Sequence, residues 1–156
     1  MNRAVSARLL ARARAVPILK KLSLFQGLVE DELLKVLGMC KATQLAAGER
    51  LFEQGEAGAS LYILLAGRME IIVAGKGVVH VMGPGEVVGE IGLVCSRFRR
   101  TAAARALEDC VLLHLYADIF HETVKSHPRL GYVIMRNVAH TLAQRLVERN
   151  QSTDEG

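Results

Sequence analysis

The sequence predicts a mainly β fold: an eight-stranded antiparallel β jelly roll with helices before it and a helical lid after it. Between residues 41 and 115, short runs of β-prone residues alternate with glycine-containing turns, which is typical of a sandwich or jelly roll. The segments on either side carry apolar residues at helical spacing instead. With 156 residues, 51% of them hydrophobic, the chain has the size of one domain with a substantial core.

The N-terminal segment, residues 1–17, is predicted to form a basic amphipathic helix over residues 3–16. Apolar residues fall on one helical face and arginines on the other, and Pro17 interrupts the pattern. The apolar positions are Val5, Leu9, Leu10, Ala13 and Val16. Three roles stay open for this helix: packing on the domain that follows, docking on a membrane surface or a partner, and acting as a mitochondrial transit peptide, because the segment lacks acidic residues.

The main domain is predicted to span residues 18–150, with the jelly roll at about 41–115. A short helix near residues 28–38 precedes the strands; it has acidic residues in its first turn and Gly38 near its end. Eight candidate strands follow: Thr43–Leu45, Arg50–Gln54, Leu61–Leu65, Arg68–Val73, Val78–Met82, Glu86–Val88, Thr101–Ala106 and Val111–Leu115.

Two helices within residues 116–150 are predicted to close the domain. Ala117–Ser126 is short, whereas Arg129–Glu148 is long and begins just after Pro128. The long helix carries a continuous apolar stripe, suited to packing on the barrel or on a second copy of the chain in a homodimer. The stripe consists of Leu130, Val133, Ile134, Val138, Leu142 and Leu146. Residues 151–156 are expected to form a disordered tail.

Composition and spacing argue against several classes of protein. No apolar run approaches the ~18 residues that a membrane helix needs, so no membrane span is expected. The three cysteines are odd in number and lack CxxC spacing, which favours a reduced, cytoplasmic protein, and the five histidines form no metal-binding motif. The net charge is +4, but residues 1–29 hold six basic and no acidic residues. The remainder is therefore net negative, which is untypical of a nucleic-acid binder.

One stretch, GEIGLVCSRFRRTAAARA at residues 89–106, combines groups that suit a phosphate attached to a sugar. Gly89 lets the backbone approach a ligand closely, and residues 90–94 are predicted to form one helical turn whose free N–H groups suit an anion. Arg100 offers bidentate donors for a phosphate, whereas Glu90 suits a ligand that also donates a hydroxyl. On residue types alone, an ion pair between Glu90 and Arg100 on a solvated loop would explain the same two residues.

The stretch resembles the phosphate-binding cassette of the cyclic nucleotide-binding domain family, of the type found in catabolite activator proteins and protein kinase A regulatory subunits. The family pattern is Gly-Glu, an aliphatic, a small and an aliphatic residue, then after a gap Arg-[Ser/Thr/Ala]-Ala. The matching residues are Val88, Gly89, Glu90, Ile91, Gly92, Leu93, Arg100, Thr101, Ala102, Ala104 and Ala106. A second signature, LFEQGEAGASLYILLAGRMEII at residues 51–72, is in register upstream. The resemblance covers about residues 18–150.

This resemblance implies a role for each part of the site. Glu90 would accept a hydrogen bond from the ribose 2′-hydroxyl, and Arg100 would pair with the exocyclic oxygens of the cyclic phosphate. Backbone N–H groups near Gly89, Ile91 and Thr101 would complete the phosphate site. The implied binding residues are Gly89, Glu90, Ile91, Gly92, Leu93, Arg100, Thr101 and Ala102. Candidates for the base pocket are Val73, Val81 and Val88, and candidates on the last helix for capping the base are Arg136, Asn137, His140, Arg149 and Asn150.

The expected function is that of a non-enzymatic intracellular sensor. It would bind cyclic AMP or cyclic GMP without a metal and would signal to an unidentified protein effector as the last helix moves. A threonine at position 101 often accompanies cyclic GMP in this family and is also compatible with cyclic AMP. Unlike the catabolite activators, the chain shows no DNA-reading module, so we expect a stand-alone domain or a regulatory piece of a longer protein.

Three departures from the family pattern leave alternatives open. Ser60 stands where an acidic residue is common, Phe52 is bulkier than the usual β-branched residue, and Cys95–Arg99 make the tip of the cassette basic. A basic tip would suit a cyclic di-GMP receptor. A jelly-roll interaction module with a vestigial site is the second alternative. Nucleic-acid binding through RFRR ranks last, because the sequence shows neither aromatic platforms nor a recognition helix.

Overall fold

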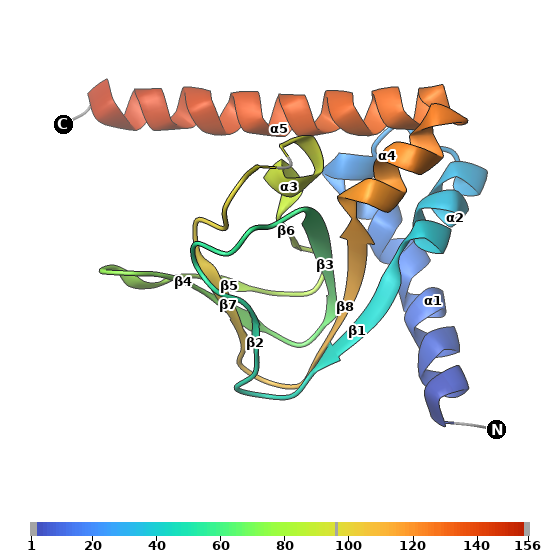
Figure 1. Ribbon diagram of the computed structural model, residues 1–156, viewed down its shortest axis with the longest axis horizontal. Helices are drawn as coiled ribbons and strands as arrows, with labels where there is room; N and C mark the ends of the chain where they lie inside the picture. The colour runs from blue at the N-terminus through green and yellow to red at the C-terminus, as the bar shows by residue number, and fades with distance from the viewer. Residues whose placement is uncertain (1–2, 96, 155–156) are drawn as a thin grey trace.

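The computed structural model describes the backbone of residues 3–95 and 97–154, and the side chains of residues 12–95 and 97–152. Eight antiparallel strands form two four-stranded sheets, with α1 and α2 beside them and the long α5 across one end (Figure 1). The strands are β1 Lys41–Leu45, β2 Arg50–Phe52, β3 Ser60–Ala66, β4 Met69–Val73, β5 Gly77–Met82, β6 Val87–Val88, β7 Ala103–Ala106 and β8 Cys110–Tyr116. The helices are α1 Arg3–Lys21, the 3₁₀ helix η1 Ser23–Phe25, α2 Glu30–Met39, α3 Glu90–Val94, α4 Ala117–Lys125 and α5 Pro128–Asp154. The predicted jelly roll with flanking helices is confirmed.

The two sheets enclose one core, the inner core, and the helices form a second, the outer core, with the outer face of the sheet that contains β3 and β8. The strand orders are β1-β8-β3-β6 and β2-β7-β4-β5. Because neighbouring residues of a strand face opposite ways, the pair Leu64 and Leu112 faces the other sheet, while Ile63 and Leu113 face the helices. The inner core consists of Phe52, Leu64, Met69, Met82, Ala104, Ala106, Cys110 and Leu112.

The helix α1 is longer than predicted, because it continues through Pro17 to Lys21. A proline within a helix removes one backbone hydrogen bond. Ala15 and Leu19, on either side of it, are fully buried in the outer core, and this packing outweighs the loss. Ala13, predicted to lie on the apolar face, is exposed. Three other predicted positions have side chains outside the described residues: Val5, Leu9 and Leu10.

The start of α2 is tied to α5 through Glu32. The Val29 N–H donates to Glu32 Oε1 at 3.0 Å, which caps the first turn of α2. The Arg129 guanidinium of α5 binds the same carboxylate. The Val29 N–H and then Arg129 hold the pKa of Glu32 below its usual value. This contact joins two helices through residues that lie 97 positions apart in the chain.

The helix α5 also exceeds its predicted length. It runs to Asp154, so residues 151–154 are helical rather than a disordered tail. No glycine or proline occurs between residues 132 and 154, and nothing else in that stretch ends a helix. The first half of the apolar stripe is buried against the domain, whereas Leu146, in the second half of α5, is 60% exposed. Among the described residues, no helix combines the length and apolarity needed to cross a membrane.

Four strands are shorter than predicted: β4 and β6 each begin one residue later, and β2 and β7 each lose two residues. β2 ends at Phe52 rather than Gln54, and β7 begins at Ala103 rather than Thr101. Residues 101–102 form a bend, because the segment before them leaves the sheet to pair with the loop between β2 and β3. The bend sets the direction from which Arg100 enters the interior.

Candidate functional site

The turn from β6 into α3 is built on Gly89. Its φ is 91°, in the left-handed region that glycine adopts without strain. A Cβ at this position would clash with Arg100 Nη1 and lie 2.5 Å from the Ser60 carbonyl oxygen. Gly92, one turn further on, is also constrained, because a Cβ there would lie 2.7 Å from the Gly58 carbonyl oxygen. Gly89 and Gly92, both predicted site residues, are therefore positions where only glycine lets the segments around residues 58–60 and Arg100 approach so closely.

Arg100 reaches this turn because residues 98–100 lie antiparallel to residues 55–58. The Arg100 N–H donates to the Glu56 carbonyl at 2.7 Å, and the Gly58 N–H donates to the Phe98 carbonyl at 3.1 Å. Gly58 also makes room for the arginine, since a Cβ there would lie 2.6 Å from Arg100 Cζ. The loop that precedes β7 is thus folded back on the β2–β3 loop, and it directs the Arg100 side chain inward.

The Arg100 guanidinium is buried and lacks an acidic partner. Arg100 is 7% exposed; its Nη2 donates to the Ser60 carbonyl at 3.0 Å, and its Cζ lies 4.4 Å from the centroid of the Phe52 ring. None of the eight ion pairs among the described residues includes it. Burial lowers the pKa of Arg100, yet a guanidinium keeps its charge in proteins. A buried charge without an ion-pair partner is unfavourable, so an anion that contacted this guanidinium would be stabilised.

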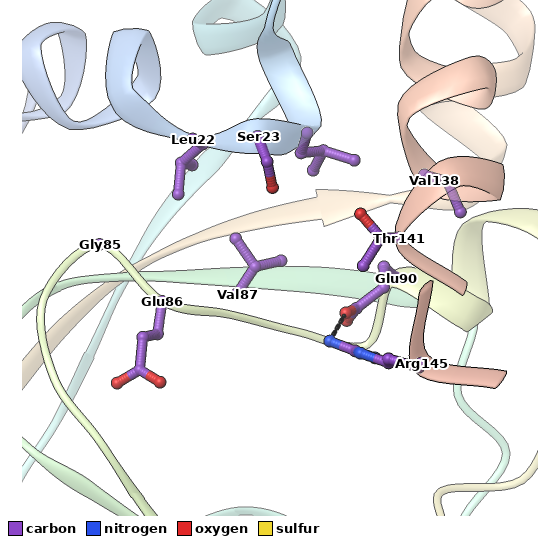
Figure 2. Close-up of a pocket in the computed structure, with 10 residues that line it drawn as sticks. Leu22, Ser23, Gly85, Glu86, Val87, Glu90, Val138, Thr141 and Arg145 are labelled. Atoms are coloured by element: carbon purple, nitrogen blue, oxygen red, sulfur yellow. Dashed lines mark hydrogen bonds and ion pairs between the residues drawn. The ribbon is translucent and has the colours of Figure 1, made fainter. Parts of the chain in front are cut away.

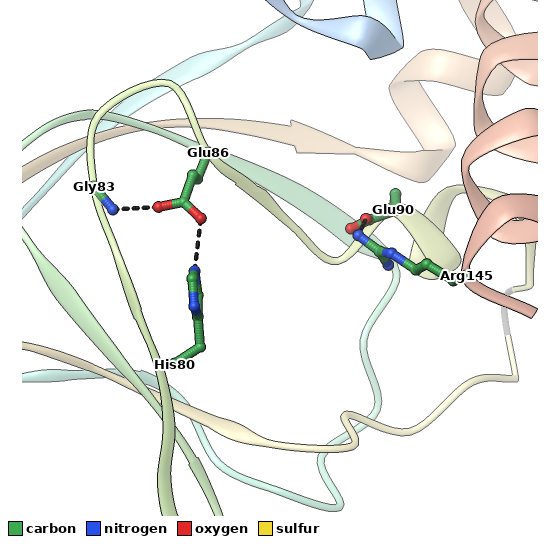
Figure 3. Close-up of polar contacts among 5 residues, drawn as sticks. All are labelled: His80, Gly83, Glu86, Glu90 and Arg145. Atoms are coloured by element: carbon green, nitrogen blue, oxygen red, sulfur yellow. Dashed lines mark hydrogen bonds and ion pairs between the residues drawn. The ribbon is translucent and has the colours of Figure 1, made fainter. Parts of the chain in front are cut away.

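Glu90, the first residue of α3, is paired with the last helix. It is 9% exposed, and its Oε1 accepts a hydrogen bond from Arg145 Nη2 of α5 at 2.6 Å (Figure 3). The ion pair between Glu90 and Arg100 that residue types alone would allow does not form among these contacts. The carboxylate therefore adjoins the Gly89 turn and α5 at the same time.

The other predicted site residues have different surroundings. Leu93 is buried in the outer core, and its carbonyl accepts a hydrogen bond from His121 Nε2 of α4 at 2.6 Å. Leu93 thus anchors α3 to the helical layer. Ile91 and Ala102 are half-buried, and Thr101 is exposed in the bend before β7.

Two of the three base-pocket candidates face the interior. Val88 packs against the inner core, and Val73 lies on the same face of β4 as Ile71, which also packs there. Val81 is 43% exposed, and the prediction for it is wrong. It adjoins the buried Met82 on β5, so the alternation of the strand turns Val81 outward.

One of the α5 residues expected to cap a base is held elsewhere. Asn137 Nδ2 donates to the carbonyls of Leu24 and Gln26, each at 2.9 Å, and thereby fastens α5 to η1. An α5 residue that does reach the cassette is Arg145, which was not among the predicted capping residues. Arg145 lies seven residues after the buried Val138 and hence on the same side of the helix, so spacing could have placed it on the face toward the domain but not against Glu90.

A cavity of about 220 Å³ separates α5 from β6 (Figure 2). Its lining residues are Leu22, Ser23, Leu24, Gly85, Glu86, Val87, Glu90, Val138, Thr141 and Arg145. Glu90 is the residue of this lining that belongs to the predicted site, and Arg100 does not line the cavity. The cavity therefore borders the Glu90 carboxylate but not the Arg100 guanidinium.

A second carboxylate, Glu86, fixes the turn between β5 and β6. It accepts hydrogen bonds from the Gly83 N–H at 2.5 Å and from His80 Nε2 at 2.6 Å (Figure 3). Partial burial acts to raise the pKa of Glu86, but the Gly83 N–H and His80 outweigh it, so the pKa lies below its usual value. These two hydrogen bonds of Glu86 close the turn that leads to the Gly89 segment.

A row of rings runs from Arg100 along the first sheet to the exposed Tyr116. The Tyr62 ring stacks on His114 with 4.2 Å between centroids, and His114 lies 3.9 Å from the Tyr116 ring. Burial, and then the charges of Arg100 and Lys41, lower the pKa of His114 to about 4, so the imidazole is neutral near pH 7. Among the described residues, no group of His, Cys, Asp or Glu side chains could hold a metal ion.

Comparison with known proteins matches one family. The model of the cyclic nucleotide-binding domain matches residues 42–127, more than half of the chain, and this range includes the whole of residues 88–106. The potassium channel AKT1 of Oryza sativa subsp. indica is 34% identical over 131 residues, which cover 81% of this chain and 14% of the channel. The cyclic AMP receptor protein of Thermus thermophilus is 30% identical over 135 residues, which cover 84% of this chain and 60% of that protein.

The fold has solved counterparts as well. The crystal structure of Thermus thermophilus catabolite activator protein aligns with a TM-score of 0.74 and 29% identity, covering 85% of this chain and 62% of that one. The chain thus spans less than two thirds of the length of each of these three proteins.

Proposed function

Because the chain belongs to the cyclic nucleotide-binding domain family, we propose that it is a non-enzymatic cytoplasmic sensor that binds cyclic AMP or cyclic GMP at residues 88–106. The observation that carries this proposal is the buried guanidinium of Arg100, which lies against the Gly89 turn and has no acidic partner among the described residues. A buried charge without a counter-ion is unfavourable, and the phosphodiester anion of a cyclic nucleotide would supply the counter-ion.

Each residue of the site has a role in this proposal. Arg100 binds the exocyclic phosphate oxygens with the donors that the Ser60 carbonyl leaves unused. Glu90 accepts a hydrogen bond from the ribose 2′-hydroxyl, and the backbone N–H groups near Gly89 and Ile91 add to the phosphate contacts. The remaining members shape the turn and the entry to β7: Gly92, Leu93, Thr101 and Ala102.

The identity of the base follows less directly from the site. Cyclic AMP is the first ligand to test, since one relative at 30% identity is a cyclic AMP receptor protein. The exposed Thr101 hydroxyl beside Arg100 also suits the amino group of guanine, which makes cyclic GMP the second ligand. The exposed Arg97 and Arg99 at the tip favour cyclic di-GMP as a third.

The helix α5 is the element proposed to transmit binding. Arg145 and the ribose hydroxyl compete for the Glu90 carboxylate, so a bound nucleotide weakens the hold of α5 on the site. The cavity beside this contact leaves α5 space to shift. The ligand drives the shift only through its different affinity for the two positions of the helix. The exposed Leu146 and Val147 then offer an apolar surface to an effector or to a second copy of the chain.

Calorimetric titration with cyclic AMP, cyclic GMP and cyclic di-GMP tests the proposal. The wild type is expected to bind at least one of them with sub-millimolar affinity. Arg100→Ala is expected to weaken this binding about tenfold or more, which is the loss of one charge-assisted hydrogen bond. Arg97→Ala, which removes an exposed arginine of the same loop, is the matched control and is expected to keep the affinity for a cyclic mononucleotide.

Two results would reject the proposal. If none of the three nucleotides binds, the sensor function fails and a jelly-roll interaction module remains. If Arg100→Ala and Arg97→Ala weaken the binding of a cyclic mononucleotide equally, the arginines attract the ligand by charge alone and the site is misplaced.

A further inference from the structure

The Arg100 guanidinium is seated on two aromatic rings. The centroid of Phe52 lies 4.4 Å from Arg100 Cζ and that of Tyr62 lies 5.7 Å from it. The two ring centroids are 6.0 Å apart, and the ring planes are inclined by 36°. Phe52 comes from β2 and Tyr62 from β3, which belong to different sheets. An aromatic face attracts a cation within about 6 Å, and more strongly where water is excluded.

The edges of the guanidinium meet backbone rather than side chains. Nη2 donates to the Ser60 carbonyl at 3.0 Å. Nε and Nη1 lie against Gly58 and Gly89, where any side chain would clash with them. The five N–H donors of arginine lie in the plane of the group, so stacking on a ring engages the face of the guanidinium and leaves these donors available.

We propose that Phe52 and Tyr62 are positioning residues that hold Arg100 by its face, so that its in-plane donors and its full charge stay available to an anion. A carboxylate in the same place would also orient the guanidinium, but it would neutralise the charge and occupy two donors. The aromatic rings fix the position without doing either. The inference rests on the proposed function only in taking the anion to be a cyclic phosphate, since the contacts of Arg100 with Phe52 and Tyr62 are present in the free protein.

The ring behind Tyr62 supports this arrangement. His114 stacks on Tyr62 at 4.2 Å, on the sheet strand next to it. An imidazolium here would repel Arg100, but burial, Arg100 and Lys41 lower the pKa of His114 to about 4 and keep the ring neutral. His114 thus fixes Tyr62 in place without adding a charge beside the anion site.

Nucleotide affinity of Phe52→Leu is the first test. Leucine keeps the apolar bulk of the inner core but lacks a ring face. We expect affinity for the best-binding cyclic nucleotide to fall about tenfold, within the range of a desolvated cation–π contact. Tyr62→Leu, at the longer distance and at a half-buried position, is the second variant and is expected to lose about threefold. Met82→Leu, in the same inner core, is the matched control and is expected to bind as the wild type does.

The Arg100 side-chain resonance is the second test, and it needs no ligand. The Nε–H signal in nitrogen-edited NMR spectra, assigned by its loss in Arg100→Ala, is expected to be shifted upfield by the Phe52 ring. Phe52→Leu should remove most of this shift, whereas Met82→Leu should not. If Phe52 contributed only to general stability and did not lie over the guanidinium, its replacement would lower thermal stability and affinity but leave the resonance where it is.

The outcomes separate this inference from the proposed function. An unchanged Arg100 resonance in Phe52→Leu and Tyr62→Leu overturns the positioning role, even if affinity falls. A lost shift with unchanged affinity overturns it as well, because the rings would then not matter to the site. If no cyclic nucleotide binds the wild type, the proposed function fails. The Arg100 Nε–H resonance alone then decides whether Phe52 and Tyr62 hold the guanidinium by its face.

Discussion

Replacement of Gly58 by alanine is expected to displace Arg100 and to remove most nucleotide binding. A Cβ at position 58 would lie 2.6 Å from Arg100 Cζ and 2.8 Å from its Cδ. Ordinary contacts between such atoms are about 3.5 Å or longer, so the side chain must move by about 1 Å. Gly58 does not have a positive φ, so alanine fits the backbone and the conflict falls on the arginine.

The magnitude follows from the contacts that this movement breaks. The hydrogen bond from Arg100 Nη2 to the Ser60 carbonyl is 3.0 Å long and has a charged donor, a type that contributes about 1.5–3 kcal/mol. A phosphate contact that depends on the same placement should weaken by a similar amount. The expected loss of affinity is therefore about 10- to 100-fold.

The assay is calorimetric titration of Gly58→Ala with the nucleotide that the wild type binds best, with circular dichroism as the check on folding. Gly38→Ala is the matched control, because a Cβ there meets nothing within 4 Å. The control should bind as the wild type does. A Gly58→Ala variant that is folded and binds with wild-type affinity would refute the claim that this placement of Arg100 makes the site.

Three further predictions concern the surroundings of the site. The pKa of His114 falls from 6.5 to about 4 on folding, so the unfolded chain takes up the proton first as the pH drops. Between pH 8 and pH 5, protonation of the unfolded state at His114 should therefore lower the free energy of unfolding of the wild type by about 2 kcal/mol. Chemical unfolding at both pH values should show a correspondingly smaller loss in His114→Phe, and equal losses would contradict the pKa shift. Arg145→Leu should raise nucleotide affinity about two- to fivefold, because it frees Glu90 from an ion pair that is partly open to solvent, and a lower affinity in the same titration would argue against competition. The wild type should sediment as a dimer and Leu146→Glu as a monomer, since Leu146 is 60% exposed; a monomeric wild type would exclude the homodimer.

The β region could be predicted because its signals are local. Alternation of buried side chains and glycine turns lie within a few residues of one another, and the positive φ values of Gly67, Gly85 and Gly89 are what such turns need. The same holds for Gly89 and the helical turn after it, whereas the roles predicted for Glu90 and Arg100 depended on the resemblance to the cyclic nucleotide-binding domain family.

The contacts that complete the site could not be predicted in this way. Arg145 lies 55 residues from Glu90, and only the packing of α5 brings them together. That Phe52 faces the guanidinium depends on the pairing of residues 98–100 with residues 55–58, which no local pattern specifies. The predicted ends of α1 and α5 were wrong for a related reason, because helix ends also depend on tertiary packing. In α1, the burial of Ala15 and Leu19 stabilises the helix through Pro17, although a proline locally disfavours a continuous helix.

The most direct test of the central claim compares a cyclic nucleotide with its 2′-deoxy analogue, in the wild type and in Glu90→Ala. The account predicts one site per chain in the wild type and a preference of about tenfold or more for the ribose form, because the 2′-hydroxyl donates to a charged acceptor. In Glu90→Ala this preference should fall below about threefold, while the affinity for the 2′-deoxy form changes little. Failure of the wild type to bind, or a ribose preference that survives in Glu90→Ala, would contradict the account.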